Sequence, residues 1–296
     1  MSTSLKLDPV AKAEVLLEAL PYIQRFRNST FLIKYGGSFM DDPDESLRQQ
    51  VIRDIVLLSA VGVRIVIVHG GGKAISRAMN KAGLEPRFIR GLRVTDKESI
   101  RIVEKTLNKE INNEICELLS HQKGKPLGFP GNTILNCSKL ESFSENGELI
   151  DLGFVGKIQS VSTAPIESAL EEGSIPVLSS IATDPDGSVF NTNADEAASA
   201  VASALLARRL VYLCDVPGLL RDPKDPSSII RTLYLDQVDE LKDSGVISSG
   251  MLPKVDSAIR AIQAGVKRVH FIDARMPHSI LLEIFTDKGI GTEIRK

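Results

Sequence analysis

The sequence predicts an α/β protein whose mainly parallel central sheet is covered by helices on both faces. Short runs of buried-type residues alternate with segments of helical periodicity along nearly the whole chain, which is the pattern of βαβ units. Two predicted strands lead directly into glycine turns, in "TFLIKYGGSF" (30–39) and "RIVIVHGGGKAIS" (64–76). With 296 residues the chain exceeds a typical single domain, so we expect one large α/β unit or two lobes.

The first predicted element is an amphipathic helix over residues 9–26, in which apolar residues recur at helical spacing. Pro21 lies inside this segment and should kink or break the helix. The helix precedes the first strand and is not needed to begin a sheet. It therefore either packs on its own domain or makes an oligomer contact, and the sequence alone favours neither.

Strands and helices then alternate to the end of the chain. Asp96 is placed to cap the longest helix, and "ENGE" is a turn signal inside a predicted hairpin. No repeat of solenoid length and no low-complexity linker divides the sequence. The predicted elements are strand 30–34, helix 46–60, strand 64–69, a helix ending before 83, helix 96–121, hairpin 132–153, strand 175–181, helix 194–207, strand 210–214, helix 252–264, strand 268–272 and helix 279–285.

Composition excludes several classes of function. The formal net charge of -2, without a basic stripe, predicts neither a nucleic-acid nor a membrane partner. Charged residues interrupt the apolar runs near the N-terminus, and no run reaches the roughly 18 residues that a membrane span needs. Cys116, Cys137 and Cys214 are widely spaced in apolar surroundings, which argues against a disulfide framework or zinc site and favours a cytoplasmic location.

The two glycine turns match neither common phosphate-binding motif. Gly72-Lys73 is followed by Ala74, where a Walker A loop needs Ser or Thr, and Ile75 occupies the last glycine position of the dinucleotide fingerprint. What remains is a strand, a run of glycines and a helix start. Converging N–H groups and the positive end of a helix dipole make an anion cradle. We therefore predict that both turns hold phosphate oxygens, with Lys34 beside the first.

Two further strings carry polar residues at predicted helix starts. "NTNADEAA" (191–198) contains Asp195, which taken alone indicates no more than a helix cap. "GMLPK" (250–254) places Lys254 in the first turn of a helix, where a cation opposes the helix dipole. This placement indicates an anionic neighbour for Lys254.

Together these strings resemble the amino acid kinase family, and within it the acetylglutamate kinase branch. The resemblance covers nearly the whole chain from residue 31 onward, in the family's order. It implies a three-layer αβα sandwich with an oligomerisation helix (1–28), an N-terminal lobe for the acylated amino acid and dimerisation (29–182), and a C-terminal lobe for ATP and arginine (183–296). It also implies transfer of the ATP γ-phosphoryl group to the side-chain carboxylate of N-acetyl-L-glutamate, in arginine biosynthesis. The matching strings are "IKYGGS", "VIVHGGGKAIS", "RGLRVTD", "IVEKTLNKEINNEI", "VFNTNADEAA", "LCDVPGLLRDP" and "GMLPK".

The resemblance assigns roles to matching positions. Lys34 and Lys254 would neutralise the transferring phosphoryl group from two sides, and Asp195 would hold both lysines in place. Arg93, on the α-carboxylate, and Asn191 would bind the acylated amino acid. The backbone and strand-end positions that would contact substrate, phosphate or nucleotide are Gly71, Gly72, Gly36, Gly37 and Asp215.

These residue types suit the chemistry. A carboxylate with a pKa of about 4.3 is already ionised at neutral pH, so its attack on phosphorus needs no general base. The obstacle is repulsion between two anions, which is about 4 kcal/mol for one unit pair at 4 Å and an effective dielectric of 20. Lysines and oriented N–H groups reduce it, and Mg²⁺ would be held mainly by the ATP phosphates. His69 precedes the glycine turn and is expected to support the loop instead of acting as a base.

A regulatory layer is also implied by resemblance. The N-terminal helix with Pro21, and "HSILLEIFTDKGIGTEI" (278–294), resemble the arginine-inhibited, hexameric branch of the family. The implied assembly is a trimer of dimers inhibited by L-arginine, and a nitrogen-signalling regulatory protein is a further candidate partner. Glu283 is the candidate contact for the effector, with an ordinary helix-surface charge as the alternative.

The sequence also departs from the family in two places and leaves two rival functions open. One departure is "DAR" (273–275) where the family has "DGR", which bears only on the inhibitor site. "GFPGNTI" (128–134) stands where the family has "GLSGKDG", which puts the hairpin region and the acyl pocket in question. The nearest rival is a sibling kinase acting on another acylated carboxylate, such as acetylaminoadipate. The other is a non-catalytic arginine sensor that keeps the fold, although a retired site has no physical reason to retain two facing cations.

Overall fold

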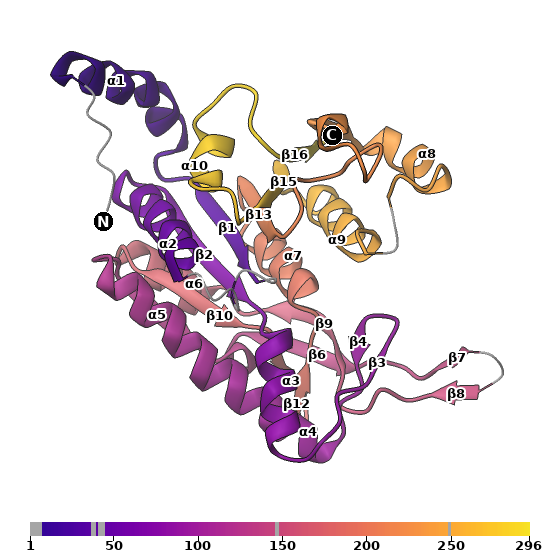
Figure 1. Ribbon diagram of the computed structural model, residues 1–296. Helices are drawn as coiled ribbons and strands as arrows, with labels where there is room; N and C mark the ends of the chain where they lie inside the picture. The colour runs from indigo at the N-terminus through magenta and orange to yellow at the C-terminus, as the bar shows by residue number, and fades with distance from the viewer. Residues whose placement is uncertain (1–7, 37–39, 41–44, 146–147, 248–249) are drawn as a thin grey trace.

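The computed structural model describes residues 8–36, 40, 45–145, 148–247 and 250–296. An eight-stranded sheet runs through the middle of the molecule (Figure 1). Every pair of neighbouring strands is parallel except β15 and β16, which confirms the mainly parallel sheet. In spatial order the strands are β14 (Thr232–Tyr234), β16 (Thr292–Arg295), β15 (Arg268–Asp273), β13 (Arg209–Cys214), β1 (Thr30–Tyr35), β2 (Arg64–His69), β10 (Ile175–Ser179) and β5 (Pro126–Phe129).

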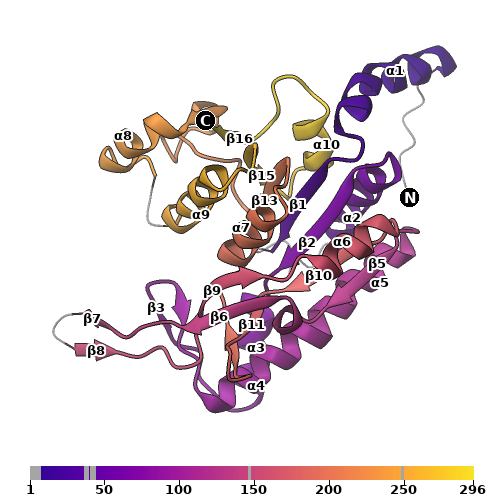
Figure 2. The same cartoon turned by 180° about the vertical axis from the view of Figure 1, so that it is seen from behind.

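Helices cover both faces of this sheet because alternate residues of each strand point to opposite sides. On β1, Phe31 and Ile33 belong to one hydrophobic core and Leu32 belongs to the other. Figure 2 shows the same layers from behind. The core that contains Phe31 and Ile33 includes residues from helices α2 (Glu45–Ala60), α3 (Gly72–Lys81), α4 (Lys97–Lys105), α5 (Asn112–His121) and α10 (Ser279–Ile284). The core that contains Leu32 includes residues from helices α6 (Ala164–Glu171), α7 (Ala194–Ala204), α8 (Val238–Asp243) and α9 (Leu252–Gln263).

The predicted long helix over 96–121 is present but changes its winding in the middle. Asp96 accepts the N–H groups of Glu98 and Ser99 at the N-terminus of α4, which confirms the cap. Between α4 and α5 the chain forms a π-helical turn over Thr106–Ile111. Such turns inside α-helices are rare and are frequent at functional sites. Here it lies against the glycine turn that follows β2.

The segment predicted as one hairpin over 132–153 is divided between two sheets. β6 (Leu135–Lys139) pairs with β9 (Gly156–Val161) in a second sheet, so its partner lies beyond the predicted hairpin. β7 (Phe143–Glu145) and β8 (Glu148–Ile150) pair with each other as a projecting arm, and residues 146–147 of the turn lie outside the described residues. The other short strands are β11 (Ile181–Thr183) and β12 (Val189–Asn191) in the second sheet, and the separate pair β3 (Phe88–Ile89) and β4 (Leu92–Arg93). Short 3₁₀ turns occur at Gly131–Thr133, Pro226–Ser228 and Leu235–Gln237.

The N-terminal helix α1 (Pro9–Phe26) projects from one end of the molecule in both views (Figures 1 and 2). Asp8 caps it, and the helix continues through Pro21, so the predicted break does not occur. Its C-terminal residue Phe26 is buried against the sheet, whereas much of its apolar surface is exposed. The exposed apolar side chains of α1 are Val10, Val15, Leu16, Leu17 and Leu20.

The remaining predicted elements differ from the structure by a few residues at their ends, as helix and strand ends generally do. The division into lobes at residue 182 stays a prediction, and that position falls within β11. None of the helices formed by the described residues combines the length and apolar character required to cross a bilayer.

Candidate active site

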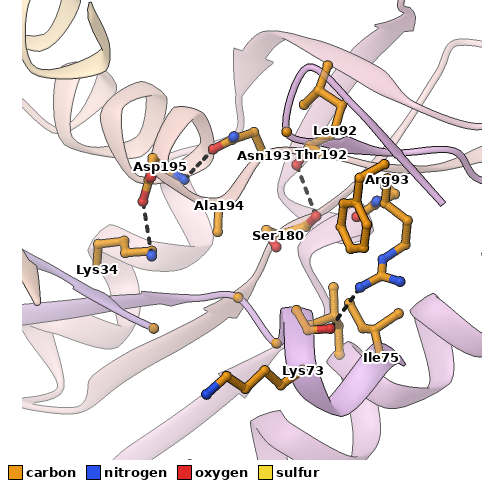
Figure 3. A pocket seen from close by; sticks show the side chains of 18 of the residues that line it. Lys34, Lys73, Ile75, Leu92, Arg93, Ser180, Thr192, Asn193, Ala194 and Asp195 are labelled. Atoms are coloured by element: carbon orange, nitrogen blue, oxygen red, sulfur yellow. Dashed lines mark hydrogen bonds and ion pairs between the residues drawn. The ribbon is translucent and has the colours of Figure 1, made fainter. Parts of the chain in front are cut away.

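A cavity of about 420 Å³ lies at the carboxyl ends of β1, β2, β10 and β13 (Figure 3). β1 has β2 on one side and β13 on the other, so the strand order reverses at β1. Open α/β sheets bind ligands at such switch points, outside the carboxyl ends of the strands. The residues that follow these four strands all line the cavity: Gly36 after β1, Gly70, Gly71 and Gly72 after β2, Ser180 after β10 and Asp215 after β13.

Two lysines meet one carboxylate at this cavity. Lys34 Nζ lies 3.0 Å from Asp195 Oδ1, and Lys254 Nζ donates to Asp195 Oδ2 at 2.6 Å. The Lys34 contact is an ion pair without a directed hydrogen bond, so Oδ1 retains acceptor capacity. Burial alone would raise the pKa of Asp195, but the two ammonium groups outweigh it and hold that pKa at about 2. Asp195 is therefore ionised at neutral pH.

Three different elements bring these side chains together. Lys34 alternates with Ile33 and Tyr35 on β1, so it points to the same side of the sheet as α7. Asn193 caps α7 by accepting the N–H groups of Asp195 and Glu196, which places Asp195 in the first turn. Lys254 lies in the first turn of α9, which packs against α7. The anionic neighbour predicted for Lys254 is thus the Asp195 carboxylate.

The glycine turn after β2 is tightly enclosed. A Cβ atom at Gly71 would collide with Ile111 Cδ1 and lie 2.9 Å from Leu107 Cδ2, so the π-helical turn leaves room only for glycine at that position. A Cβ atom at Gly36 would come within 2.9 Å of Lys34 Nζ. Gly36 and Gly71 therefore let the backbone approach the lysine and the cavity closely. Gly37 lies outside the described residues.

His69 supports this turn from inside the protein. It is fully buried, and burial lowers its pKa to about 4, so the ring is neutral. Its Nδ1 lies 3.1 Å from the Gly70 carbonyl oxygen, and its Nε2 lies 3.1 Å from Nδ2 of Asn112. An Nδ1–H tautomer donates to that oxygen and accepts from the Asn112 amide, which also donates to the Val177 carbonyl oxygen. This places His69 in a supporting position and gives it no catalytic contact.

Arg93 and Asn191 also line the cavity, and Figure 3 shows the Arg93 side chain well away from Lys34 and Asp195. Arg93 Nη2 donates to the Gly72 carbonyl oxygen at 2.7 Å and to Ser76 Oγ at 2.9 Å, and the guanidinium lies over the Phe88 ring, 4.5 Å from its centroid. Asn191 Nδ2 approaches Thr95 Oγ1 at 3.5 Å. The cavity is thus lined by a fixed guanidinium and an amide as well as by Lys34 and Asp195, whereas Lys254 contacts Asp195 from outside the lining.

Lys73 and Phe88 are among the lining residues that sequence reasoning missed. Lys73 directly follows the glycines, which was a usable signal. Phe88 is paired across β3 and β4 with Arg93, and two-residue strands leave no periodicity to detect. No group of three or more His, Cys, Asp or Glu side chains suited to a metal ion occurs among the residues the structure describes.

Glu283 lies elsewhere, at a separate cavity of about 220 Å³ between α1 and the amino ends of β13 and β15. We call it the Glu283 cavity; Tyr22 and Arg25 of α1 also line it. Glu283 is buried: its Oε1 lies 2.6 Å from His270 Nδ1, and its Oε2 accepts the N–H groups of Ile290 and Gly291. Burial raises its pKa, but the bonds with His270 and the two N–H groups lower it overall. The alternative of an ordinary surface charge is therefore wrong.

Comparisons with known proteins agree with this arrangement. Residues 29–273 match the amino acid kinase family. The acetylglutamate kinase of Akkermansia muciniphila is 48% identical, over 96% of each chain, and that of Methanobrevibacter smithii is 47% identical, over 95% of this chain and 98% of the relative. N-acetylglutamate synthase from Neisseria gonorrhoeae, complexed with coenzyme A and N-acetyl-glutamate, superposes with a TM-score of 0.83 at 28% identity. The superposition covers 96% of this chain and 63% of the synthase.

Proposed function

The chain belongs to the amino acid kinase family, and we propose that it transfers the γ-phosphoryl group of ATP to the side-chain carboxylate of N-acetyl-L-glutamate. The product is N-acetyl-L-glutamyl 5-phosphate, an intermediate of arginine biosynthesis, and the reaction takes place in the cytoplasm. One observation carries the proposal: Lys34 and Lys254 converge on Asp195 beside the cavity that the glycine turns enclose. In support, the two relatives that match almost the full chain carry the name acetylglutamate kinase.

The lysine pair addresses the main barrier of this reaction. A carboxylate oxygen of the substrate attacks the γ-phosphorus, the bond from that phosphorus to the bridging oxygen breaks, and ADP leaves with the electron pair. No proton moves, because the attacking carboxylate is already ionised. Lys34 and Lys254 stabilise the negative charge that builds on the transferring group. Asp195 keeps both ammonium groups oriented, and its pKa of about 2 means that it accepts no proton from them at neutral pH.

Arg93 and Asn191 account for recognition of the acylated amino acid. The Arg93 guanidinium has a carbonyl and a hydroxyl partner for Nη2, and among the described residues Nη1 faces only the weak acceptor Met79 Sδ. A substrate α-carboxylate would be a far better acceptor for the remaining donors. The Asn191 amide offers a second polar contact in the same cavity. Phe88 limits how far the guanidinium can turn.

The cavity's cations and glycine N–H groups suit a phosphate chain. We propose that Mg²⁺ enters bound to ATP oxygens, where it neutralises part of the phosphate charge. We propose that Asp215, which follows β13 and lines the cavity, contacts the nucleotide.

The test is phosphoryl transfer by the purified protein with MgATP, in parallel on N-acetyl-L-glutamate and on acetylaminoadipate. Trapping with hydroxylamine detects the acyl phosphate itself and excludes simple ATP hydrolysis. We expect efficient transfer to N-acetyl-L-glutamate, and much slower transfer to the longer acid because its carboxylate is displaced by about one methylene. Faster transfer to acetylaminoadipate would replace the proposal with the sibling kinase. Arginine binding without any transfer would replace it with the sensor.

We further propose that L-arginine inhibits the enzyme and that α1 joins dimers into a hexamer. The Glu283 cavity offers a buried carboxylate beside α1, which would suit a guanidinium or amino group. In support, the synthase of Neisseria gonorrhoeae has also been solved with coenzyme A and L-arginine. The exposed apolar residues of α1 offer a surface for a second copy. Docking of a nitrogen-signalling regulatory protein on this hexamer stays a prediction.

A further inference from the structure

A third cavity, of about 590 Å³, lies at the amino ends of β1, β13 and β15, at the opposite end of the sheet from the candidate active site. We call it the basic cavity. No carboxylate lines it among the described residues. Five cationic side chains do: Arg208 and Lys267, and also Arg25, Arg209 and Arg268, which line the adjoining Glu283 cavity as well.

These cations outnumber their anionic partners. Glu293 is the one carboxylate within ion-pair distance of any of them in the described part of the chain: Arg268 Nη1 lies 2.5 Å and Arg209 Nη1 3.6 Å from its Oε2. The same carboxylate also pairs with Arg295. Arg208 forms no ion pair with a described residue, and its pKa is lowered by partial burial and by neighbouring arginines. The cavity therefore holds an excess of positive charge.

The cations are also held in place. The guanidinium carbons of Arg208 and Arg209 each lie 5.3 Å from the centroid of the Phe26 ring, and that of Arg25 lies 5.7 Å from it. One buried ring thus keeps three guanidinium groups close together despite their mutual repulsion. Arg209 is only 6% exposed, and its Nε has no hydrogen-bond partner among the described residues. Burial and the neighbouring arginines lower the pKa of Arg209 to about 10. Buried donors in proteins normally have an acceptor, so this Nε–H of Arg209 is where an anionic acceptor would fit.

We propose that the basic cavity binds a phosphate dianion, either free or as the phosphate group of a small ester. A dianion would balance charge that Glu293 leaves uncompensated, and guanidinium groups recognise phosphate oxygens in a bidentate geometry. Because Arg25 comes from α1 and Arg209 and Arg268 from β13 and β15, the bound anion would fasten the end of α1 to the sheet. This binding is independent of the phosphoryl transfer at the other end of the sheet.

The test is calorimetric titration of inorganic phosphate into the protein saturated with N-acetyl-L-glutamate and the Mg²⁺ complex of a non-hydrolysable ATP analogue, which blocks the first cavity. Titration with glycerol phosphate in parallel distinguishes a free phosphate from an ester. The test variant is Arg208→Gln/Lys267→Gln, which removes two cations that form no ion pair with a described residue. The matched control is Lys97→Gln/Lys125→Gln, which removes two exposed lysines that line neither the basic cavity nor the Glu283 cavity.

We expect saturable binding to the wild type and the control. Binding should be at least about tenfold weaker in the test variant, since two charged hydrogen-bond donors to the anion are lost. Phosphate should also raise the melting temperature of the wild type more than sodium chloride of equal ionic strength does. Equal affinities in the wild type and Arg208→Gln/Lys267→Gln would overturn the proposal, as would a thermal response that sodium chloride reproduces. Should the double variant fold poorly, Lys267→Gln alone, at an exposed position, provides the same comparison.

Discussion

Lys34 and Lys254, from opposite ends of the chain, approach the two oxygens of a single carboxylate, that of Asp195. Their ammonium nitrogens lie 3.0 Å from Oδ1 and 2.6 Å from Oδ2. Asp195 keeps two cations close together that would otherwise repel each other, and an incoming phosphoryl group would meet both. The remaining features of the cavity are arranged around this pair.

Replacing Lys34 or Lys254 with alanine should lower kcat by about 10²- to 10³-fold, because each removes one preorganised charge from the transition state. The protein should remain folded, since the other lysine still pairs with Asp195. The measurement is steady-state kinetics with MgATP and N-acetyl-L-glutamate. The matched control is Lys242→Ala, which breaks an ion pair with Asp256 that does not involve Asp195. Near-wild-type kcat in either active-site variant would rule out the lysine mechanism.

Asp195 should give the protein a stability that is lost in strong acid. Its pKa in the folded protein, about 2, lies below the ordinary value of 3.8, so its contribution is present above pH 4 and disappears as the pH falls from about 4 to 2. The difference between these two pKa values corresponds to about 2 kcal/mol of folding free energy. In urea unfolding, the free energy of unfolding of the wild type should therefore exceed that of Asp195→Asn at pH 6, and this difference should become smaller towards pH 2. If this difference in unfolding free energy stays constant with pH, Asp195 is not stabilised as a carboxylate by the two lysines.

His69 should affect stability in a higher pH range. Because burial lowers its pKa from 6.5 to about 4, the unfolded chain binds a proton that the folded protein excludes, and stability falls as the pH drops from 6.5 to 4. Over that range the free energy of unfolding of His69→Gln should depend less on pH than that of the wild type. The control His121→Gln, at an exposed position, should show the same pH dependence as the wild type. Between pH 6.5 and 8.5 the shape of the kcat profile should be the same in His69→Gln and the wild type. An ionisation that vanishes with His69 would identify it as a base after all.

The sequence predicted the strands and glycine turns of the site because these are local features. β2 begins and ends where predicted, since the apolar run 65–68, flanked by Arg64 and by His69 before the glycine turn, has few alternatives. Lys254 was conspicuous for a similar reason, as a cation in the first turn of a helix. Its partner could not be identified from local pattern, because Asp195 by itself looked like part of a cap. Only the packing of α7 against α9 brings the two together.

The features that were missed depend on contacts between distant segments. β16 is four residues long and pairs antiparallel with β15, so neither its length nor a hairpin turn marked it. β6 was assigned to a local hairpin, whereas it pairs with β9. For Glu283 the sequence left an effector contact and a surface charge both open, because its burial depends on His270 in another element. Sequence periodicity does not carry information of this kind.

Glu283→Gln should abolish or strongly weaken inhibition by L-arginine while leaving the uninhibited rate close to that of the wild type, because the Glu283 cavity is separate from the lysine pair. Glutamine keeps the size of the side chain but removes the charge that would pair with the effector. The measurement is the arginine concentration at half inhibition, with Glu240→Gln as an exposed control on α8. Unchanged inhibition in Glu283→Gln would place the effector elsewhere.

The exposed apolar residues of α1 should be required for the hexamer. Leu16 and Leu20 are one helical turn apart and are 71% and 42% exposed, so both face outward from the same side of the helix. Leu16→Asp/Leu20→Asp should reduce the hexamer to dimers, measured by light scattering coupled to size-exclusion chromatography, because buried unpaired carboxylates disfavour an apolar contact. Lys12→Asp makes the same change in net charge at a polar position of α1 and should leave the hexamer intact. The uninhibited kinase activity should persist in both variants, since α1 does not line the candidate active site. A hexamer that survives in the double variant would show that another surface joins the dimers.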